Sequence, residues 1–415
     1  MPNLAVPASH HTKPTGFRAA LEALNFFMAD MQAGIGPFLG IFLLAHQWKS
    51  GAIGTVMTLG GVAGVLVTIP AGALIDQTKR KKLYVIIPGV CTVLASAVIL
   101  LSQNFWIVGL SQVATAIAGA AIVPAVMAIT LGLVKQKGFN RQNGRNQAWN
   151  HAGNMVGAGL SGYLGMVYGM HAIFYLSAAF GLISIILVST IPASAIDDRA
   201  ARGMKAGNDL SNDTSSYKEL LECKPLLMLA AALACFHLGN GAMLPMYGLG
   251  AASQGNSNAS MFVAMTIVIA QLVMIGASIV AMRSADKSGY WLVMLLSFLS
   301  LPIRGLVAAS LNYHIGVYPV QALDGIGAGL QSVAVPALVA HILNGTGRIN
   351  VGQGAVMTVQ GVGAALSPAI GGWLAQSMGF KPAFVVLGSF AVISIFIWVY
   401  YSKTLRNVCD HGHKH

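Results

Sequence analysis

Long apolar segments dominate this sequence and constrain its fold more than any other feature. A helix needs ~20 mainly apolar residues to cross the hydrocarbon core of a bilayer, and twelve segments of the chain meet that requirement. Most polar stretches between them are short, so we expect an all-α integral membrane protein with twelve transmembrane helices. The expected helices cover residues 18–45, 51–75, 83–103, 105–134, 146–168, 171–192, 225–250, 258–282, 290–312, 315–343, 352–378 and 381–402.

The composition agrees with a membrane protein and argues against a soluble one. Hydrophobic residues make up 55% of the chain and charged residues only 9%, whereas soluble globular domains carry roughly 25% charged residues. The four cysteines lie far apart and show neither disulfide nor zinc spacing. The first residues lack the apolar core of a cleavable signal peptide, so we expect them to remain as a tail.

One polar separator is longer than the others and divides the chain. Residues 193–224 are rich in Ser, Asn and Asp, a composition typical of a linker. The predicted units are a cytoplasmic N-terminal tail (1–17), a six-helix bundle (18–192), a cytoplasmic linker (193–224), a second six-helix bundle (225–402) and a cytoplasmic C-terminal tail (403–415).

Lysine and arginine are distributed unevenly and predict the orientation of the chain. With the N-terminus inside the cell, all but three of the 24 Lys and Arg residues lie on the cytoplasmic side; the exceptions are Lys49, Arg304 and Lys381. This is the positive-inside distribution of membrane proteins. We therefore expect a multi-pass protein of the plasma membrane, in bacteria the inner membrane, with both termini cytoplasmic. The net charge of +12 then reflects topology, and no nucleic-acid partner is expected.

The two predicted bundles repeat each other, which makes them pseudo-symmetric. The fifth helix reads VGAGLSGYLG at Val156–Gly165 and the eleventh reads VGAALSPAIG at Val362–Gly371. The fourth and tenth helices match at Gln112–Ala120 and Gln321–Gly329. Each match joins a helix to the one six places later, a plan known from secondary transporters that bind substrate between two halves. Chance similarity of Gly- and Ala-rich helices is the alternative.

Two short segments carry a resemblance to a known family. Residues 72–82 read GALIDQTKRKK and residues 285–291 read ADKSGYW. Both resemble the signature loop of the major facilitator superfamily, Gly-x-x-x-Asp-Arg/Lys-x-Gly-Arg-Arg/Lys, and both stand after the second helix of a predicted half. The matching residues are Gly72, Asp76, Arg80 and Lys81 in the first copy and Asp286, Lys287 and Gly289 in the second.

The resemblance implies two six-helix bundles that rock about a central site, and it implies a role for the signature loops. In the superfamily, the acid of this loop pairs with bases across the seam between the halves in the outward-open state. Carried over, Asp76 and Asp286 would form a cytoplasmic gating latch. A plain topology signal is the other explanation of the basic cluster. Gln112 stands where drug–proton antiporters often carry an arginine, so the antiporter interpretation gains only mild support.

Asp30 is the sole acid in the interior of the first apolar segment, with Gln32 two residues later. A charge at bilayer depth is costly and usually serves function, and the resemblance places this helix and the seventh on the central cavity. A carboxylate in a partly dry cavity can load and release a proton near neutral pH. We therefore predict that Asp30 is the proton-coupling acid or binds a cationic substrate group. An Asp that bonds to its own helix is the alternative.

The second half contributes four further candidates for the central cavity. Arg304 and Asp324 have similar predicted depths on consecutive antiparallel helices, so we expect a buried ion pair. That pair serves either the structure of the bundle or the binding of substrate or protons. His237 and Asn240 are three residues apart, share a helix face and can face Asp30 across the pseudo-twofold axis. His237 alone could also be a satisfied core histidine.

The first turns of the fifth helix are unusually polar. Asn150, His151 and Asn154 occupy its cytoplasmic third, where they line a hydrated vestibule or contact substrate. Hydrogen bonds between helices without ligand contact are the alternative. Near the start of the first helix, Glu22 follows Arg18 by one turn, which predicts a local ion pair.

The sequence carries no phosphate-binding loop, no zinc-protease motif and no nucleophile elbow. We therefore expect no enzymatic activity, no metal and no cofactor, with a proton gradient as the source of energy. The predicted function is proton-coupled export of a small organic molecule, such as a drug, metabolite or siderophore, by a monomer in the lipid bilayer. A proton-coupled uptake symporter and a non-transporting receptor or assembly factor are the alternatives.

Overall fold

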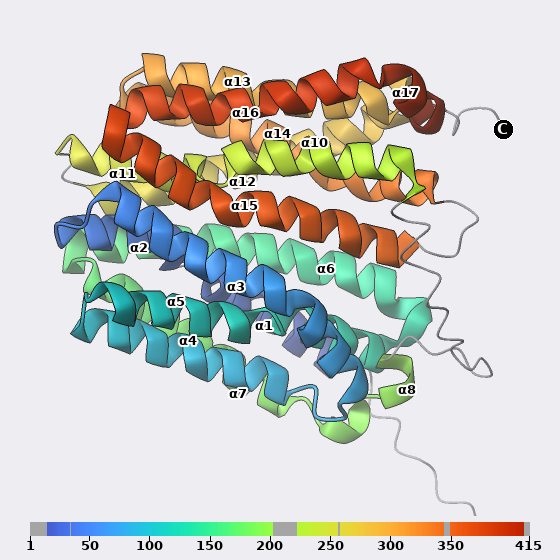
Figure 1. The fold of residues 1–415 in the computed structure, drawn as a ribbon. Coiled ribbons are helices and arrows are strands. Elements are labelled where there is room, and N and C mark those ends of the chain that lie inside the picture. Colours follow the sequence, from blue (N-terminus) through green and yellow to red (C-terminus); the bar gives the residue numbers. More distant parts are fainter. Residues whose placement is uncertain (1–14, 34, 202–221, 256–257, 344–348, 411–415) are drawn as a thin grey trace, which may run out of the picture.

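A computed structural model of the chain describes residues 15–33, 35–201, 222–255, 258–343 and 349–410. Nearly all of these residues are helical, and none of them lies in a strand. Helices suit a bilayer because each one pairs its backbone N–H and C=O groups within its own segment. Figure 1 shows the long helices side by side, with the first half of the chain packed along the second.

Each half of the chain supplies one group of helices. In the first half these are α1 (Thr15–Ala33), α2 (Ile35–Ala45), α3 (Ser50–Gln77), α4 (Leu83–Leu101), α5 (Phe105–Gly119), α6 (Ile122–Tyr168), α7 (His171–Thr190), the 3-10 helix η1 (Ala193–Ala195) and α8 (Asp198–Ala201). In the second half they are α10 (Lys224–Asn240), α11 (Met243–Ser253), α12 (Ala259–Ser288), α13 (Tyr290–Ser310), α14 (Tyr313–Ile342), α15 (Ile349–Met378), α16 (Phe380–Tyr400) and α17 (Ser402–Asp410).

The predicted number of membrane crossings agrees with these helices. Among the described residues, ten segments are long and apolar enough to cross a membrane, judged by length and composition. The first predicted helix is absent from that set because α1 carries Arg18, Glu22 and Asp30, and the apolar helix Gly36–Ala45 is too short to be counted alone. The fifth predicted helix is absent because it forms the second part of α6, and the turns after Lys135 in that part are polar. With these two added, the described helices supply the twelve expected crossings.

The predicted loop between the fourth and fifth helices is wrong, because this segment is helical. α6 continues through it and departs from helical geometry at Lys135, where φ is 55° and ψ is 176°. Gln142 and Arg145 in this segment donate hydrogen bonds to Glu22 of α1. These bonds give the polar segment a partner on a neighbouring helix, which the sequence alone does not reveal.

Two other predicted ends also differ. α12 extends to Ser288, so Asp286 and Lys287 lie in its last turn rather than in a loop. The expected C-terminal tail begins as α17, which packs against α13 and α14. Leu405 of α17 is buried, and the guanidinium of Arg406 lies 4.0 Å from the centroid of the Trp291 ring. An amphipathic helix therefore docks where a solvated tail was expected; residues 411–415 lie outside the described part.

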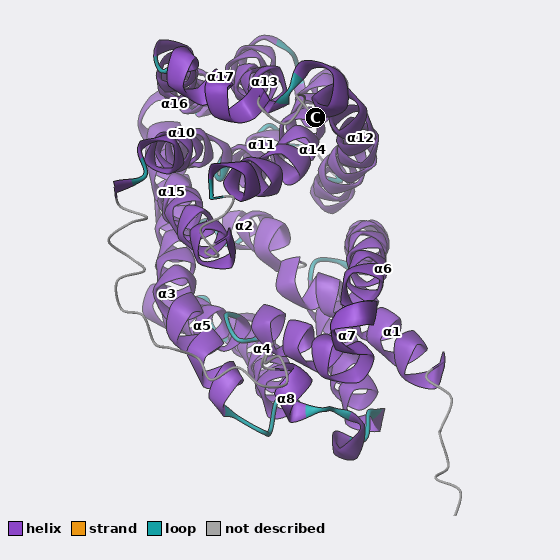
Figure 2. Ribbon diagram, turned by 90° about the vertical axis from the view of Figure 1, so that its right-hand side faces the viewer, coloured by secondary structure: helices purple, strands orange, loops and turns teal. Residues whose placement is uncertain are grey.

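The two halves meet mainly along two pairs of helices, with a smaller contact between α2 and α11. α3 packs against α15, and α6 packs against α12. Figure 2, which looks along the bundle, shows α1 to α8 on one side and α10 to α17 on the other, with these two pairs between them. In the predicted numbering of crossings, the pairs are helix two with eleven and helix five with eight, as the sequence repeat requires.

Glycines and short polar side chains bring α3 and α15 into close contact. A Cβ atom at Gly54 would collide with the carbonyl oxygen of Pro368. The Ser50 hydroxyl donates to the carbonyl oxygen of Gly372 at 3.0 Å, and the Gly51 N–H donates to Oε1 of Gln376 at 3.1 Å. These contacts involve the first turns of α3 and the last turns of α15. They close the seam at the end that the positive-inside distribution predicts to face outward.

Candidate functional site

The seventh predicted helix is broken in the middle of the bundle. α10 ends at Asn240 and α11 begins at Met243. The backbone N–H of Ala242, at the break, donates to the hydroxyl of Ser367 on α15 at 2.8 Å. A Cβ atom at Gly241 would lie 2.7 Å from the carbonyl oxygen of Ala364, so the close approach of α15 requires glycine there. Gly241 and Ala242 keep right-handed helical φ and ψ, so the break is a local interruption of the backbone hydrogen bonds within one crossing, Lys224–Ser253.

A buried polar cluster, formed by Arg304 with Asn240, Gln321 and Asp324, lies beside that break. Nη1 of Arg304 is 2.6 Å from Oδ1 of Asp324, so the predicted ion pair is confirmed. The same nitrogen donates to Oδ1 of Asn240 at 2.7 Å, and Nη2 donates to Oε1 of Gln321 at 3.3 Å. The Arg304 side chain is 1% exposed and that of Asp324 is 15% exposed. The cluster thus joins α10, α13 and α14 around one charge that is fully withdrawn from solvent.

Two donors in this cluster have no hydrogen-bond partner among the described residues. They are Nε of Arg304 and Nε2 of Gln321, and both are buried. An unpaired buried donor costs free energy. The cluster therefore keeps two buried donors that the described residues do not pair.

His237 lies one turn before Asn240 on α10 and belongs to a separate chain of hydrogen bonds. Its Nε2 is 3.1 Å from Oε1 of Gln331, and Nε2 of Gln331 donates to the Ser297 hydroxyl at 2.9 Å. The histidine is therefore held by α14 and α13. The hypothesis of a satisfied core histidine gains support from these contacts.

Asp30 and Gln32 lie in the last turns of α1. Their side chains lie outside the described residues. The predicted placement of Asp30 opposite His237 and Asn240 therefore stays a prediction.

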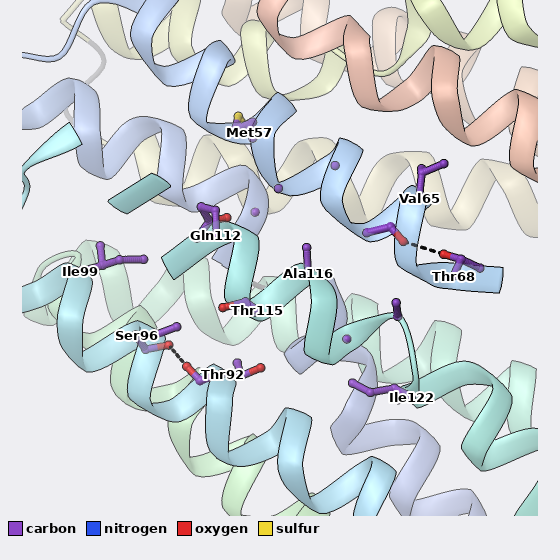
Figure 3. Close-up of a pocket in the computed structure, with 17 residues that line it drawn as sticks. Met57, Val65, Thr68, Thr92, Ser96, Ile99, Gln112, Thr115, Ala116 and Ile122 are labelled. Atoms are coloured by element: carbon purple, nitrogen blue, oxygen red, sulfur yellow. Dashed lines mark hydrogen bonds between the residues drawn. The ribbon is translucent and has the colours of Figure 1, made fainter. Parts of the chain in front are cut away.

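Gln112 faces a cavity within the first half. This cavity, which we call the N-half cavity, has a volume of about 530 Å³ and lies between α3, α4 and α5. Figure 3 shows Gln112 with Thr115 on α5 and Thr92 with Ser96 on α4 around it. Sequence reasoning found Gln112 and missed the three hydroxyl residues, because Ser and Thr are common in membrane helices and give no pattern that marks a cavity.

The polar residues of the fifth predicted helix face in different directions. Asn154 donates to Oδ1 of Asn150 at 3.3 Å, and Asn150 donates to the carbonyl oxygen of Asn25 on α1 at 3.4 Å. Nδ1 of His151 instead lies 3.1 Å from Oε1 of Gln271 on α12. His151 thus bridges the seam between the halves, whereas the two asparagines join helices within one half.

The predicted ion pair of Glu22 with Arg18 is wrong. Oε1 of Glu22 is 2.8 Å from Nε of Arg145 on α6, and the indole N–H of Trp149 donates to Oε2 at 3.0 Å. Gln142 adds a third contact at 3.3 Å. The helical segment after Lys135 brings these donors to α1, so a partner distant in sequence replaces the local one.

The described side chains of the signature loops lie within their own half. Lys81 is buried, donates to the carbonyl oxygen of Thr78 at 2.7 Å and lies 3.5 Å from Oδ1 of Asp198 on α8. Arg80 is exposed. No ion pair between the described side chains crosses the seam. Each ion pair found among them joins residues of one half, or joins the first half to the start of the linker.

The remaining latch residues can be placed by their backbone. Gly72 and Asp76 lie in the last turns of α3, and Gly289 turns the chain between α12 and α13 with a φ of 72°. The side chains of Asp76, Asp286 and Lys287 lie outside the described residues. A latch that closes across the seam in another state of the protein therefore stays a prediction.

The start of the linker is tied to the first half by a second pair of charges. Oδ2 of Asp197 lies 3.6 Å from Nζ of Lys135. Oδ1 of Asp197 accepts hydrogen bonds from the backbone N–H groups of Arg199 and Ala200 at the start of α8. The hydrogen bond from Ala200, with further contributions from Arg199 and Lys135, lowers the pKa of Asp197 below its usual range.

Comparison with known proteins points to one family. The model of the Major Facilitator Superfamily matches residues 21–348. Two curated relatives, both described as uncharacterized MFS-type transporters from strains of Mycobacterium tuberculosis, are 37% identical over 380 residues, which is 91% of this chain and 91% of each relative.

Solved structures agree at the level of the fold. A mutant form of the nucleoside transporter NupG aligns with a TM-score of 0.79 and 14% identity, over 92% of this chain and 99% of that one. A bacterial homolog of the human lysosomal transporter Spinster, in an inward-facing conformation, aligns with a TM-score of 0.74 and 12% identity, over 97% and 99%. A POT family transporter in complex with 5-aminolevulinic acid aligns with a TM-score of 0.73 and 11% identity, over 96% and 98%.

Proposed function

Because the chain belongs to the major facilitator superfamily, we propose that it is a proton-coupled secondary active transporter that exports a small organic molecule by alternating access. The cluster of Arg304, Asp324 and Asn240 at the break of the seventh crossing carries this proposal. It joins a permanently charged side chain to an acid that solvent can still reach. No cofactor other than the proton gradient enters the scheme, and a monomer in the bilayer is its unit.

Asp324 is the group in this cluster that can exchange a proton. Arg304 stays charged in proteins, and its side chain is almost fully buried, whereas that of Asp324 is 15% exposed. Protonation of Asp324 leaves the buried guanidinium without its counter-charge, which is strongly unfavourable. The protonated cluster must therefore rearrange, and because Asn240 ends α10, a shift of Arg304 acts directly on the break in the helix.

The seam between the halves supplies the moving part. Close packing at Gly54 and Gly372 holds α3 against α15 at the end predicted to face outward. The Ser367 hydroxyl ties α15 to the break after α10. A rearrangement at Arg304 is thus one helix away from the contacts that must separate for the other face to open. Asp30, in the last turns of α1, is proposed as a second proton-binding acid.

Proton flux in proteoliposomes tests this function. The purified protein is reconstituted with a pH-sensitive dye inside the vesicles, and a panel of small organic solutes is applied with and without a pH gradient. An exporter moves protons opposite to the solute, whereas an uptake symporter moves both in one direction. Movement in the same direction would contradict export, and solute flux that ignores the pH gradient would contradict proton coupling.

Asp30→Asn is the variant that examines the second acid. It keeps the size of the side chain and removes its charge, so the protein should still reach the membrane. Loss of gradient-driven transport is expected, with Asp197→Asn in the linker as a control that retains it. Full activity of Asp30→Asn would remove Asp30 from the scheme.

A further inference from the structure

The N-half cavity has the size of a site for a small molecule. Its volume of about 530 Å³ falls within the roughly 300–1,000 Å³ of typical ligand pockets. It is bounded by α3, α4 and α5, with Gly36 of α2 at its edge. The Arg304 cluster, by contrast, belongs to helices of the other half. The cavity is therefore a separate feature from the charged cluster.

The hydroxyl groups of this cavity present mainly acceptors. Ser96 donates its hydrogen to the carbonyl oxygen of Thr92, Thr115 to that of Ser111, and Thr68 to that of Gly64, all at 2.8 Å. Each hydroxyl has used its single donor on its own helix, but its lone pairs remain available. Figure 3 shows the bonds of Ser96 and Thr68 as dashed lines.

Two further polar groups at the cavity have no hydrogen-bond partner among the described residues. Thr92 is 5% exposed, and its hydroxyl makes none of the side-chain hydrogen bonds found within the described part of the chain. The side-chain amide of Gln112 makes none either. The Thr92 hydroxyl and the Gln112 amide therefore keep hydrogen-bonding capacity that a molecule in the cavity can use.

Charge is absent from the cavity wall. None of its described lining residues is Asp, Glu, Lys, Arg or His. An ionised ligand would lose its hydration there and gain no counter-charge, which is expensive at this depth. The wall therefore selects against ions and in favour of neutral molecules that can donate hydrogen bonds.

We propose that the N-half cavity binds a neutral solute that carries several N–H or O–H donors. This assignment rests on the proposed transport function and names the class of its substrate. Donors of the solute meet the lone pairs of Ser96, Thr115 and Thr68. The free hydroxyl of Thr92 and the free amide of Gln112 supply the two groups that can also donate to it.

A direct binding measurement on the purified full-length protein tests the assignment. Uridine is the neutral probe, with 5′-amino-5′-deoxyuridine as its cationic counterpart and uridine 5′-monophosphate as its anionic counterpart, and calorimetry gives each Kd. The wild-type protein should bind uridine at least tenfold more tightly than either ion. Equal affinity for the three, or no binding of uridine, would overturn the assignment.

Substitutions locate the binding within the protein. A Cβ atom at Gly119 meets no atom within 4 Å, so Gly119→Val fills the cavity without a clash and should weaken uridine binding more than tenfold. Gly276→Val on α12 is its control, because the space around Gly276 is equally open and lies outside the cavity. Equal weakening by both variants, or by neither, contradicts the assignment.

A variant that gains affinity for another ligand distinguishes a change in the site from poor folding. Gln112→Glu keeps the shape of the side chain and adds a carboxylate to the cavity. It should reverse the preference, so that the amino analogue binds at least tenfold more tightly than uridine. Thr92→Val should weaken uridine binding about three- to tenfold, the range for one lost hydrogen bond. Thr358→Val, at a residue of α15 that does not line the cavity, should leave binding unchanged. An unaltered order of affinities in Gln112→Glu would overturn the proposal.

Lipid occupancy and failure of transport give distinct results. A phospholipid that copurifies with the wild-type protein and is lost from Gly119→Val, detected by native mass spectrometry, would assign the cavity to lipid and overturn the proposal. Selective uridine binding without any proton-linked flux would support the cavity and contradict the proposed function. Proton-linked flux that persists in Gly119→Val would support the proposed function and contradict the assignment of the cavity.

Discussion

The two halves of this protein repeat each other in sequence and packing, yet their polar centres are built differently. In the repeat, Thr115 of Gln112–Ala120 stands in register with Asp324 of Gln321–Gly329. The first half places a hydroxyl there and is hollow around it. The second half places a carboxylate there and packs it against Arg304 at 2.6 Å. One scaffold thus supports a neutral cavity in one half and a charged, filled cluster in the other.

The ion pairs of the two halves differ in the same way. The Arg304 and Asp324 side chains are 1% and 15% exposed, whereas Glu22 and Arg145 in the first half are 9% and 51% exposed. Water therefore reaches Arg145, in the pair of the first half, freely. The stability of the protein should therefore depend most on the charges of the second half and least on those of the linker.

The largest effect is expected from Asp324→Ala, because it leaves the guanidinium of Arg304 buried without a counter-charge. Loss of one partner of a buried pair costs about 3–5 kcal/mol. Denaturant titration in detergent micelles measures the free energy of unfolding. The double variant Arg304→Leu with Asp324→Leu should recover much of the loss, because neither charge remains. A double variant no more stable than Asp324→Ala would contradict the comparison.

The next prediction compares the same kind of substitution, a hydroxyl residue to Leu, in the filled second half and at the cavity of the first half. Ser300→Leu should destabilise the second half by about 1–3 kcal/mol through overpacking, because a Cβ atom at the neighbouring Gly327 would already lie 2.5 Å from the Ser300 hydroxyl oxygen. Thr115→Leu should cost no more than about 0.5 kcal/mol, since its side chain extends into the N-half cavity. Equal Tm changes for the two variants would show that the first half is not hollow.

A smaller effect is expected from Glu22→Gln. The amide keeps the contacts with Gln142 and Trp149 in reach and loses only the charge that pairs with Arg145. Since the Arg145 side chain is half exposed, the cost should be about 1–2 kcal/mol. Arg18→Gln serves as the control and should leave stability unchanged. If Arg18→Gln matched the loss in Glu22→Gln, the pairing with Arg145 would be contradicted.

The smallest effect concerns the exposed pair of Asp197 with Lys135 in the linker. The pKa of Asp197 is lowered in the folded protein by the N–H of Ala200 first, and also by Arg199 and Lys135. A lowered folded-state pKa means that its stabilising contribution is present above the usual Asp value of about 3.9 and disappears as pH falls through the folded value.

Hydrogen exchange of residues 193–201 measures this contribution. At pH 7, Asp197→Asn should exchange faster than the wild-type protein in this segment, because α8 loses its charged N-terminal acceptor. Below the folded pKa of Asp197 the two proteins should exchange alike. A difference that persists unchanged at acid pH would show that the charge of Asp197 is not responsible.

The sequence predicts the crossings, the repeat and one part of the site, for physical reasons that are easy to state. Arg304 and Asp324 could be paired in advance because consecutive antiparallel helices place equal depths side by side, and a buried charge needs a partner. Glu22 was assigned to Arg18 because a helix turn is the nearest source of a cation. Its real partner, Arg145, depends on a polar segment that continues as a helix, and nothing local in the sequence indicates that.

The N-half cavity is the feature that sequence reasoning could not reach. Ser96 and Thr115 satisfy their donors on their own helices, so they resemble many other hydroxyl residues of membrane helices. A cavity arises from what three helices together fail to fill, which is a property of packing and not of any one segment. Gln112 was found because the family resemblance marks its position, not because its neighbours do.

In the mechanism that we propose, protonation of Asp324 couples the proton gradient to the movement of solute. The most direct measurement compares two modes of transport by Asp324→Asn in proteoliposomes, for a solute that the wild-type protein moves. Solute exchange at equal pH on both sides requires no net proton movement and should persist. Transport driven by a pH gradient should fall to the level of empty vesicles. Gradient-driven transport at the wild-type rate in Asp324→Asn would contradict the claim.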